Sequence, residues 1–395
     1  MKLVIGNIGQ IVSGDISNPY LQGDTIVVRD QEIEALGAGT ELDTQQADIV
    51  VDARGTTVIP GLMDSHIHPT LGDFTPRQRA LDFIAMEVQG GVTSLISAGE
   101  VHVPGRPKDR EGIKALAIAA RRIFQNFRPG GAKVLAGAPI PELDMTETDF
   151  AEMAKAGVCL VGEIGLGSVR TGPDAARVVE WARKYSMKST FHTGGPSLGG
   201  SAAISAEAVL EARPDVVGHV NGGHTSVTLK EIEDLVGSGL VVEIVHNGNM
   251  KSALHAFSTA RDADGLDRII IGNDAPAGTG VVPLGILRTL SLLSGVGGLD
   301  PAVAVCCASG NTGRVYGLRS GMIASGRPAD LVIVDAPTGS QADNALSALA
   351  VGDLPGVSMV IIDGDIVVGR SRNTPPADRP AIVTKGEVRL PDQGH

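Results

Sequence analysis

The chain has 395 residues, of which 43% are hydrophobic and 20% are charged, and its formal net charge is −12. This length exceeds one small domain, and the composition allows a large buried core. The negative charge argues against a nucleic-acid partner and against attraction to an anionic membrane surface. No run of 18 apolar residues predicts a transmembrane helix.

The three cysteines, Cys159, Cys306 and Cys307, are an odd number and include a vicinal pair. This is not the pattern of a disulfide framework and favours a reducing compartment. At the N-terminus, Gly and Gln interrupt the apolar residues of MKLVIGNIGQIVSGD, and no signal-peptidase site follows. We therefore expect a cytoplasmic protein.

The first part of the chain, residues 2–58, is predicted to form short strands. The segments 2–14, 24–37 and 47–59 alternate between apolar and polar residues, or run apolar, between Gly and Asp turns. The segment RDQEIEALG within 24–37 is typical of a hairpin. We expect no helix of three turns in this region.

From residue 60 to about residue 320, short apolar runs alternate with longer amphipathic segments. The runs cover 61–68, 92–100, 132–139, 158–165, 188–195, 215–223, 240–248 and 268–276. Helices are predicted between them, at 77–91, 111–127, 146–157, 174–186, 205–214, 228–239 and 251–265, from apolar residues at i, i+3 and i+4. Eight strands that alternate with helices predict an α/β fold of the (β/α)8 TIM-like barrel type, with a doubly wound open sheet as the alternative.

The strand pattern returns in 320–337 and 357–371, with Asp363–Gly364 at a predicted hairpin turn. The two ends of the chain therefore resemble each other. We predict that residues 1–58 and 321–395 form one small β-sandwich domain, with the catalytic barrel of residues 59–320 inserted between them. The alternative is two separate β pieces. The Pro-rich segment 372–380 is expected to be an extended arm.

Polar side chains follow the predicted barrel strands where they end. His66 and His68 are two residues apart in VIPGLMDSHIHP, so in an extended backbone they point to the same side. Later runs carry further polar residues near their ends: Glu163, His192, His219 and Asp274. Since the carboxyl ends of barrel strands meet on one face, we expect these six side chains to lie close together.

Each of these residues alone has an ordinary structural interpretation, such as a hydrogen-bonded core histidine or a helix N-cap. Together they favour a metal site, because imidazole and carboxylate ligands suit Zn²⁺, Fe²⁺ or Mn²⁺. Six ligands are more than one tetrahedral ion needs, so two ions are expected. The alternative is a mononuclear site with Glu163 outside the ligand set.

The motif VIPGLMDSHIHP at 58–69, followed by His192, His219 and Asp274, resembles the amidohydrolase superfamily. The closing segment GMIASGRPADLVIVD at 321–335 supports the resemblance, which covers nearly the whole chain. It implies the barrel, the split β domain and a metal-dependent hydrolase.

The resemblance also implies roles for the candidate ligands. His66 and His68 with Asp274 would hold the more buried ion, and His192 with His219 would hold the more exposed one. Asp274 would also be the catalytic base, which takes a proton from water and passes it to the leaving nitrogen.

The chain departs from the superfamily at the end of the fourth strand, where a carboxylated lysine usually bridges the two ions. Glu163 stands in VCLVGEIGLG at that place. A glutamate carries the same charge as a lysine carbamate, so we expect Glu163 to be the bridge. Lys133 and Lys188 are poor substitutes, because they lie at the entering ends of their predicted strands.

Within the superfamily, the chain looks most like hydrolases of cyclic enamides. The stretches that carry this likeness are 73–84, 96–109, 161–167, 191–195, 219–226, 272–288 and 371–377. The resemblance implies hydrolysis of 1,4,5,6-tetrahydro-6-oxonicotinate to 2-formylglutarate and ammonia, in nicotinate breakdown. It also implies two divalent ions, zinc and/or iron, and a homo-oligomer, expected to be a tetramer.

A substrate carboxylate needs a fixed cation or hydrogen-bond donors. Arg106, in the loop after the second strand, is the first candidate, and its alternative is a solvated loop charge. Arg170 is a second, weaker candidate. Further substrate contacts are expected at Thr193, Asn221, His246 and Asn247, whereas His102 and His224 are interpreted as loop histidines.

Two alternative functions stay open. The first alternative is a related enzyme for another cyclic amide, imide or amidine, including a deaminase. The second alternative is a non-catalytic relative that lost its metals. The ligands do not separate the enzymes, because substrate choice depends on the loops. The non-catalytic alternative predicts missing ligands, and all six candidates are present.

Overall fold

The computed structural model describes residues 1–69, 80–100, 105–197, 200–222, 226–276, 282, 284–388 and 390. Its centre is a ring of eight short strands. They are β8 (Leu62–Ile67), β9 (Val92–Ser97), β10 (Lys133–Leu135), β11 (Leu160–Ile164), β12 (Lys188–Phe191), β13 (Val216–Val217), β14 (Val241–Val245) and β15 (Ile269–Gly272). Neighbouring strands are parallel within two sheets, β8 to β10 and β11 to β15.

Backbone hydrogen bonds join the two sheets into a closed barrel. The amide of Asp274 donates to the carbonyl of His66 at 2.9 Å at one seam, and Gly162 donates to Pro139 at 2.9 Å at the other. The prediction of a (β/α)8 barrel is therefore confirmed, and the open sheet is excluded.

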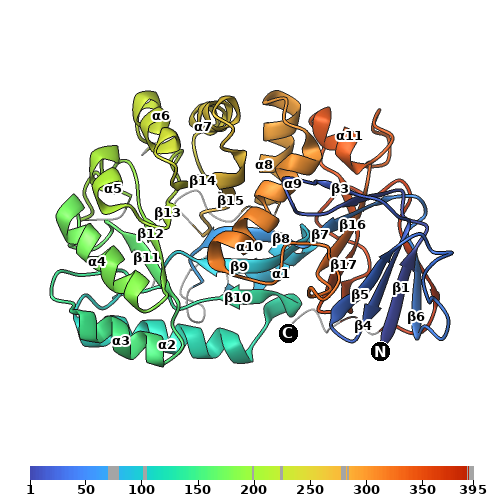
Figure 1. Ribbon diagram of the computed structural model, residues 1–395, viewed down its shortest axis with the longest axis horizontal. Helices are drawn as coiled ribbons and strands as arrows, with labels where there is room; N and C mark the ends of the chain where they lie inside the picture. Colours follow the sequence, from blue (N-terminus) through green and yellow to red (C-terminus); the bar gives the residue numbers. More distant parts are fainter. Residues whose placement is uncertain are drawn as a thin grey trace.

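Seven helices follow the strands as the apolar periodicity predicts (Figure 1). They are α1 (Ala80–Gln89), α2 (Arg110–Asn126), α3 (Glu147–Lys155), α4 (Gly172–Lys184), α5 (Ala206–Ala212), α6 (Leu229–Gly237) and α7 (Met250–Asp262). Capping boxes begin α3 and α6, at Thr146 with Asp149 and at Thr228 with Glu231. These caps satisfy backbone amides that have no partner within the helix.

A second group of short helices follows β15: α8 (Gly285–Ser291), a π-helical turn at Leu292–Val296, α9 (Pro301–Cys307) and α10 (Gly310–Tyr316). The sequence did not predict these helices. Six of the seven residues of α8 are buried, so it lacks the polar face from which an amphipathic helix is recognised.

The β strands at the two ends of the chain are paired in the same two sheets. The strands are β1 (Lys2–Gly6), β2 (Gln10–Val12), β3 (Tyr20–Leu21), β4 (Thr25–Arg29), β5 (Glu32–Gly37), β6 (Ile49–Asp52), β7 (Thr57–Pro60), β16 (Leu331–Asp335), β17 (Gly356–Ile362), β18 (Asp365–Val368) and β19 (Ile382–Lys385). Their order is β19-β6-β1-β4-β5 in one sheet and β18-β17-β16-β7-β2-β3 in the other. Figure 1 shows the N-terminal strands beside the C-terminal ones.

The apolar faces of these two sheets share one core, which includes Leu3, Ile26, Val58, Leu331 and Ile361. The predicted boundary after residue 58 falls within β7, which pairs with β16 along its whole length. The β unit therefore keeps the chain as far as residue 60. We propose that the β unit and the barrel are two domains, and these pairings support that division.

The C-terminal segment, which was expected to be an extended arm, is bound to the β unit. Arg379 donates to both carboxylate oxygens of Asp335 at 2.7 and 3.0 Å, and β19 then pairs with β6. The helix α11 (Ala345–Ala350) was also not predicted. No helix in the part of the chain that the structure describes is both long enough and apolar enough to cross a bilayer.

Candidate metal centre

The six candidate ligands meet at the carboxyl ends of the barrel strands. His66 lies in β8 and Glu163 in β11, His68 and His192 directly follow their strands, and His219 and Asp274 are the second residues after theirs. His66, Glu163 and His192 are at most 2% exposed. Two overlapping groups place their ligand atoms within 4.8 Å of one another: His66, His68 and Asp274, and His66, Glu163 and His219.

The carboxylate of Glu163 lies between two sets of imidazoles. Its Oε1 atom is 2.7 Å from His219 Nε2 and 3.1 Å from His192 Nδ1. Its Oε2 atom is 3.7 Å from Nε2 of both His66 and His68. Each oxygen thus faces one pair of ring nitrogens, which is the arrangement that a bridge between two ions requires.

Asp274 completes the set around His66 and His68. Its Oδ1 atom lies 3.2 Å from His68 Nε2 and 3.7 Å from His66 Nε2. The carboxylate of Asp274 therefore lies beside His66 and His68, the two ligands expected to share an ion with it.

Hydrogen bonds on the far side of three rings fix which nitrogen faces the centre. His68 Nδ1 lies 2.8 Å from the carbonyl oxygen of Gly99, and His192 Nε2 lies 3.1 Å from that of Gly195. His66 Nδ1 lies 2.6 Å from Oε2 of Glu243. In the neutral ring, an acceptor beside one nitrogen holds the proton there, so the other nitrogen carries the lone pair that a metal would bind.

These residues fit a pair of divalent ions. His66 Nε2 is buried and has no hydrogen-bond partner in the described part of the chain. An orphaned imidazole nitrogen that faces two carboxylates is unfavourable in a dry interior unless a cation binds it. The donor set of imidazole nitrogen and carboxylate oxygen is that of zinc and iron sites.

The electrostatics of the centre keep its carboxylates ionised. Burial acts to raise the pKa of Glu163, but the imidazoles of His66, His192 and His219 outweigh it and hold that pKa well below its ordinary value. For Asp274, burial is likewise outweighed by histidines, above all His68, and its pKa is lowered to about 2. Both carboxylates are therefore negative at neutral pH.

Unusual backbone conformations bring the strand ends together. His219 and Asp274 have φ angles of 26° and 56°, which residues other than glycine rarely adopt. Gly272 lets β15 approach β8 closely, since a Cβ atom there would lie 2.7 Å from Cβ of His66. Such strained positions are typical of functional sites.

Thr193 and Asn221 are engaged with the backbone. Thr193 Oγ1 donates to the carbonyl of Gly218 at 3.0 Å. The amide of Asn221 donates to the carbonyl of Val245 and accepts from its N–H, both at 2.9 Å. These buried side chains hold neighbouring strands together, and the substrate contacts expected at Thr193 and Asn221 stay predictions.

His246 and Asn247 follow β14 and lie near Asp274. Asn247 Nδ2 donates to the backbone carbonyl of Asp274 at 2.9 Å and so helps to fix that residue. Burial, and then the charge of Arg288, lower the pKa of His246, which favours a neutral imidazole. His246 Nδ1 lies 3.4 Å from the hydroxyl of Thr289.

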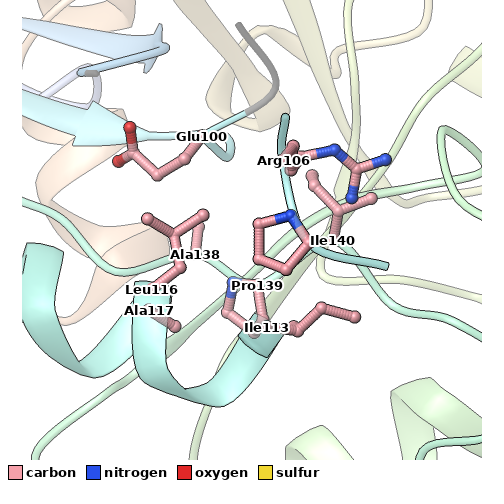
Figure 2. Close-up of a pocket in the computed structure, with 9 residues that line it drawn as sticks. Glu100, Arg106, Ile113, Leu116, Ala117, Ala138, Pro139 and Ile140 are labelled. Carbon is pink, nitrogen blue, oxygen red and sulfur yellow. The ribbon is translucent and has the colours of Figure 1, made fainter. Parts of the chain in front are cut away.

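Arg106 lines a narrow pocket, together with Glu100, the segment 138–140 and residues of the helix α2 (Figure 2). Its side chain is 11% exposed, and Nη2 lies 3.8 Å from Oε1 of Glu142. Its Nη1 atom is buried and has no hydrogen-bond partner among the described residues. Arg106 is therefore not the solvated loop charge of the alternative interpretation.

The pocket borders the metal centre through Ile140, which Figure 2 shows beside Arg106. Ile140 Cδ1 would lie 2.4 Å from a Cβ atom on Gly99 and 3.0 Å from one on Gly162, so it packs against both residues. Gly99 accepts from His68, and Gly162 precedes Glu163.

Arg170 instead donates to the carbonyl groups of Gly167 and Gly200. His102 and His224 lie outside the described residues.

The sequence analysis missed Glu243, the buried carboxylate behind His66. Its signal is a single charged residue in the middle of the otherwise apolar run VVEIV. A carboxylate inside a buried strand needs a partner, so such an interruption points to a functional neighbour.

The comparison with known proteins identifies the class. The model of the amidohydrolase family matches residues 57–367, and the chain belongs to this family. It is a hydrolase that acts on C–N bonds of cyclic amides, and its fold and candidate ligands are consistent with the divalent metal ions that the family generally uses.

Individual relatives narrow the comparison further. The enamidase of Eubacterium barkeri is 51% identical over 384 residues, which cover 97% of this chain and 99% of that protein. A crystal structure of enamidase matches with a TM-score of 0.93 and 50% identity, over 97% of this chain and 100% of that one. An adenine deaminase of Brucella abortus is 24% identical over 84% of this chain, which spans 54% of that protein.

Proposed function

We propose that this hydrolase is an enamidase, with a centre of two metal ions bridged by Glu163. The observation that carries the proposal is the position of Glu163, whose two carboxylate oxygens face separate pairs of imidazoles. The near full-length similarity to the enamidase of Eubacterium barkeri supports the substrate class.

His66, His68 and Asp274 would hold the more buried ion, and His192 and His219 the other. Zinc and iron both suit these ligands. Such ions polarise an amide carbonyl and lower the pKa of a water molecule, so that a nucleophile is available at neutral pH.

Asp274 would serve as the proton carrier. Its carboxylate is ionised at neutral pH, so it accepts a proton from the attacking water and delivers it to the ring nitrogen as the amide C–N bond breaks. The hydrogen bond from Asn247 to its carbonyl oxygen holds the backbone of Asp274, which has a positive φ angle.

The proposed substrate is 1,4,5,6-tetrahydro-6-oxonicotinate. One water opens its ring at the amide bond and leaves an enamine, which tautomerises to an imine. A second water hydrolyses the imine, and the products are 2-formylglutarate and ammonia. The substrate carboxylate would pair with Arg106, whose Nη1 has no partner among the described residues and offers a charge-assisted hydrogen bond.

The direct test measures ammonia release from this substrate by the purified protein, with zinc and iron determined in the same sample. We expect turnover that scales with metal content and approaches two ions per chain. Full metal content with no ammonia from this substrate would overturn the substrate assignment. Ammonia from adenine in that sample would instead favour a deaminase.

We also propose that the protein acts as a cytoplasmic homotetramer. The three cysteines are free thiols in the structure, which supports a reducing compartment. Sedimentation equilibrium measures the mass of the particle independently of its shape, and a stable monomer would contradict the tetramer.

A further inference from the structure

Glu243 is a fully buried carboxylate at the centre of β14. Its Oε2 atom accepts from His66 Nδ1 at 2.6 Å and from the backbone amide of His219 at 3.3 Å. Its Oε1 atom accepts from the hydroxyl of Ser65 at 2.5 Å. The side chain therefore contacts residues from both halves of the proposed metal centre.

The hydrogen-bond acceptor behind His66 differs in kind from the acceptors behind His68 and His192. His68 and His192 are backed by neutral backbone carbonyls, those of Gly99 and Gly195. His66 alone among these three rings is backed by a carboxylate. A charged acceptor makes a stronger hydrogen bond and increases the electron density of the imidazole, so its other nitrogen becomes a better ligand.

In the described part of the chain, His66 is the one side chain paired with Glu243 that can carry a positive charge. No lysine or arginine there forms an ion pair with it, and its hydrogen-bond partners are one imidazole, one hydroxyl and one amide. A buried carboxylate is costly without a compensating charge. Positive charge at His66 Nε2, on the opposite side of the ring, supplies that compensation.

We propose that Glu243 is a positioning residue that makes the two metal positions unequal, so that the ion at His66 is held more tightly than the ion at His192. This inference rests on the metal centre proposed above. Glu243 acts through the ring of His66, which it orients and polarises, and it touches neither substrate nor metal.

The experiment compares Zn²⁺ binding by metal-free wild type and Glu243→Gln, titrated against a chromogenic chelator. The glutamine keeps the shape and loses the charge. We expect the tighter Zn²⁺ affinity to fall by about 10- to 100-fold, as for other residues behind a metal ligand, while the weaker position changes far less. The wild type should therefore bind Zn²⁺ in two separated steps, and the variant in steps that lie closer together.

Ser65→Ala is the matched control, because it removes a neighbour of the same carboxylate and leaves the His66 contact in place. Its Zn²⁺ affinities should stay close to those of the wild type. The melting temperature of each metal-free protein reports any purely structural effect.

Unchanged Zn²⁺ affinities in folded Glu243→Gln would overturn the role of Glu243 but leave the centre intact. A wild type that binds no Zn²⁺ would overturn both proposals.

Glu243→Asp gives an independent test that survives misfolding of the glutamine variant. It keeps the charge but withdraws it from His66 by one methylene. Its tighter affinity should fall between those of the wild type and Glu243→Gln, and a wild-type value would contradict the proposal.

Discussion

At the scale of single residues, the proposed centre separates ligands that only bind metal from one that also moves a proton. His66 is buried with its Nε2 atom towards both carboxylates, and metal binding is its only proposed role. The variant His66→Ala therefore removes a ligand and nothing else from the mechanism. We expect this variant to lose metal and activity together. Elemental analysis and ammonia release on one sample check it, and full activity with a wild-type metal content would contradict the assignment.

Asp274→Asn should behave differently from His66→Ala. The amide oxygen still reaches the His66 and His68 side of the centre, but it cannot accept a proton at neutral pH. We therefore expect partial retention of metal and a loss of kcat of about 100- to 10,000-fold, the usual contribution of a positioned acid–base group. A variant with wild-type kcat would remove Asp274 from proton transfer.

Arg106→Leu tests the recognition of the substrate carboxylate. Its loss should lower kcat/KM by about 10- to 100-fold, which corresponds to a hydrogen bond to a charged group. The matched substrate is the carboxamide analogue, for which wild type and variant should differ far less. Equal losses on both substrates would show that Arg106 supports the loop and does not recognise the carboxylate.

The six candidate ligands were predictable because each stands near the end of an apolar run, and the barrel brings those ends to one face. Glu243 was not selected, because it lies within its strand and its role depends on which ring it contacts. Thr193 and Asn221 stand next to ligands in the sequence, but their polar atoms are used by neighbouring backbone. Adjacency in sequence did not reveal the direction of a side chain.

At the scale of elements, the close approach of β15 to β8 is what places Asp274 beside His66. Gly272→Ala would add a methyl group 2.7 Å from Cβ of His66. We expect a loss of about 1–3 kcal/mol in unfolding free energy, as for other overpacked sites, together with weaker metal binding. Thermal unfolding and zinc content are the measurements.

Gly237→Ala, at the end of α6, is the control for this substitution, because no atom of the described residues lies within 4 Å of its added Cβ atom. It should leave metal binding unchanged. A Gly272→Ala protein as stable and metal-rich as this control would contradict the packing argument.

The helices show where sequence patterns are sufficient. The seven helices from α1 to α7 carry apolar residues on one side and were predicted near their observed positions. The short helices α8 to α10 were missed: near-complete burial of α8 removes the periodic signal, and α9 and α10 are only seven residues long. The two-residue strand β13 lies within the much longer run 215–223, because pairing limits a strand more than composition does.

At the scale of the whole molecule, the barrel and the β unit are joined at the end opposite to the metal centre. Lys133, at the entering end of β10, lies 2.7 Å from Asp330 and 2.6 Å from Asp363. Both carboxylates belong to the β unit, which explains why this lysine is not available to the centre. The likeness of the two chain ends predicted a composite β unit. The end of β7 at residue 60 could not be predicted, because it is set by the pairing of β7 with β16.

Lys133→Ala would leave the nearly inaccessible carboxylate of Asp330 without its cation. We expect unfolding at lower temperature, with a cost of about 1–3 kcal/mol for an unpaired buried group, and normal metal content at low temperature. Lys230→Ala, which breaks an exposed pair with Asp234, is the control and should change stability little. Loss of metal in folded Lys133→Ala would contradict the separation of the two ends.

The measurement that tests the central claim most directly is anomalous X-ray diffraction from crystals of the metal-loaded protein. The account predicts two ions, one beside each carboxylate oxygen of Glu163, with His66, His68 and Asp274 around the first and His192 and His219 around the second. A single ion that Glu163 does not contact would contradict the bridged centre.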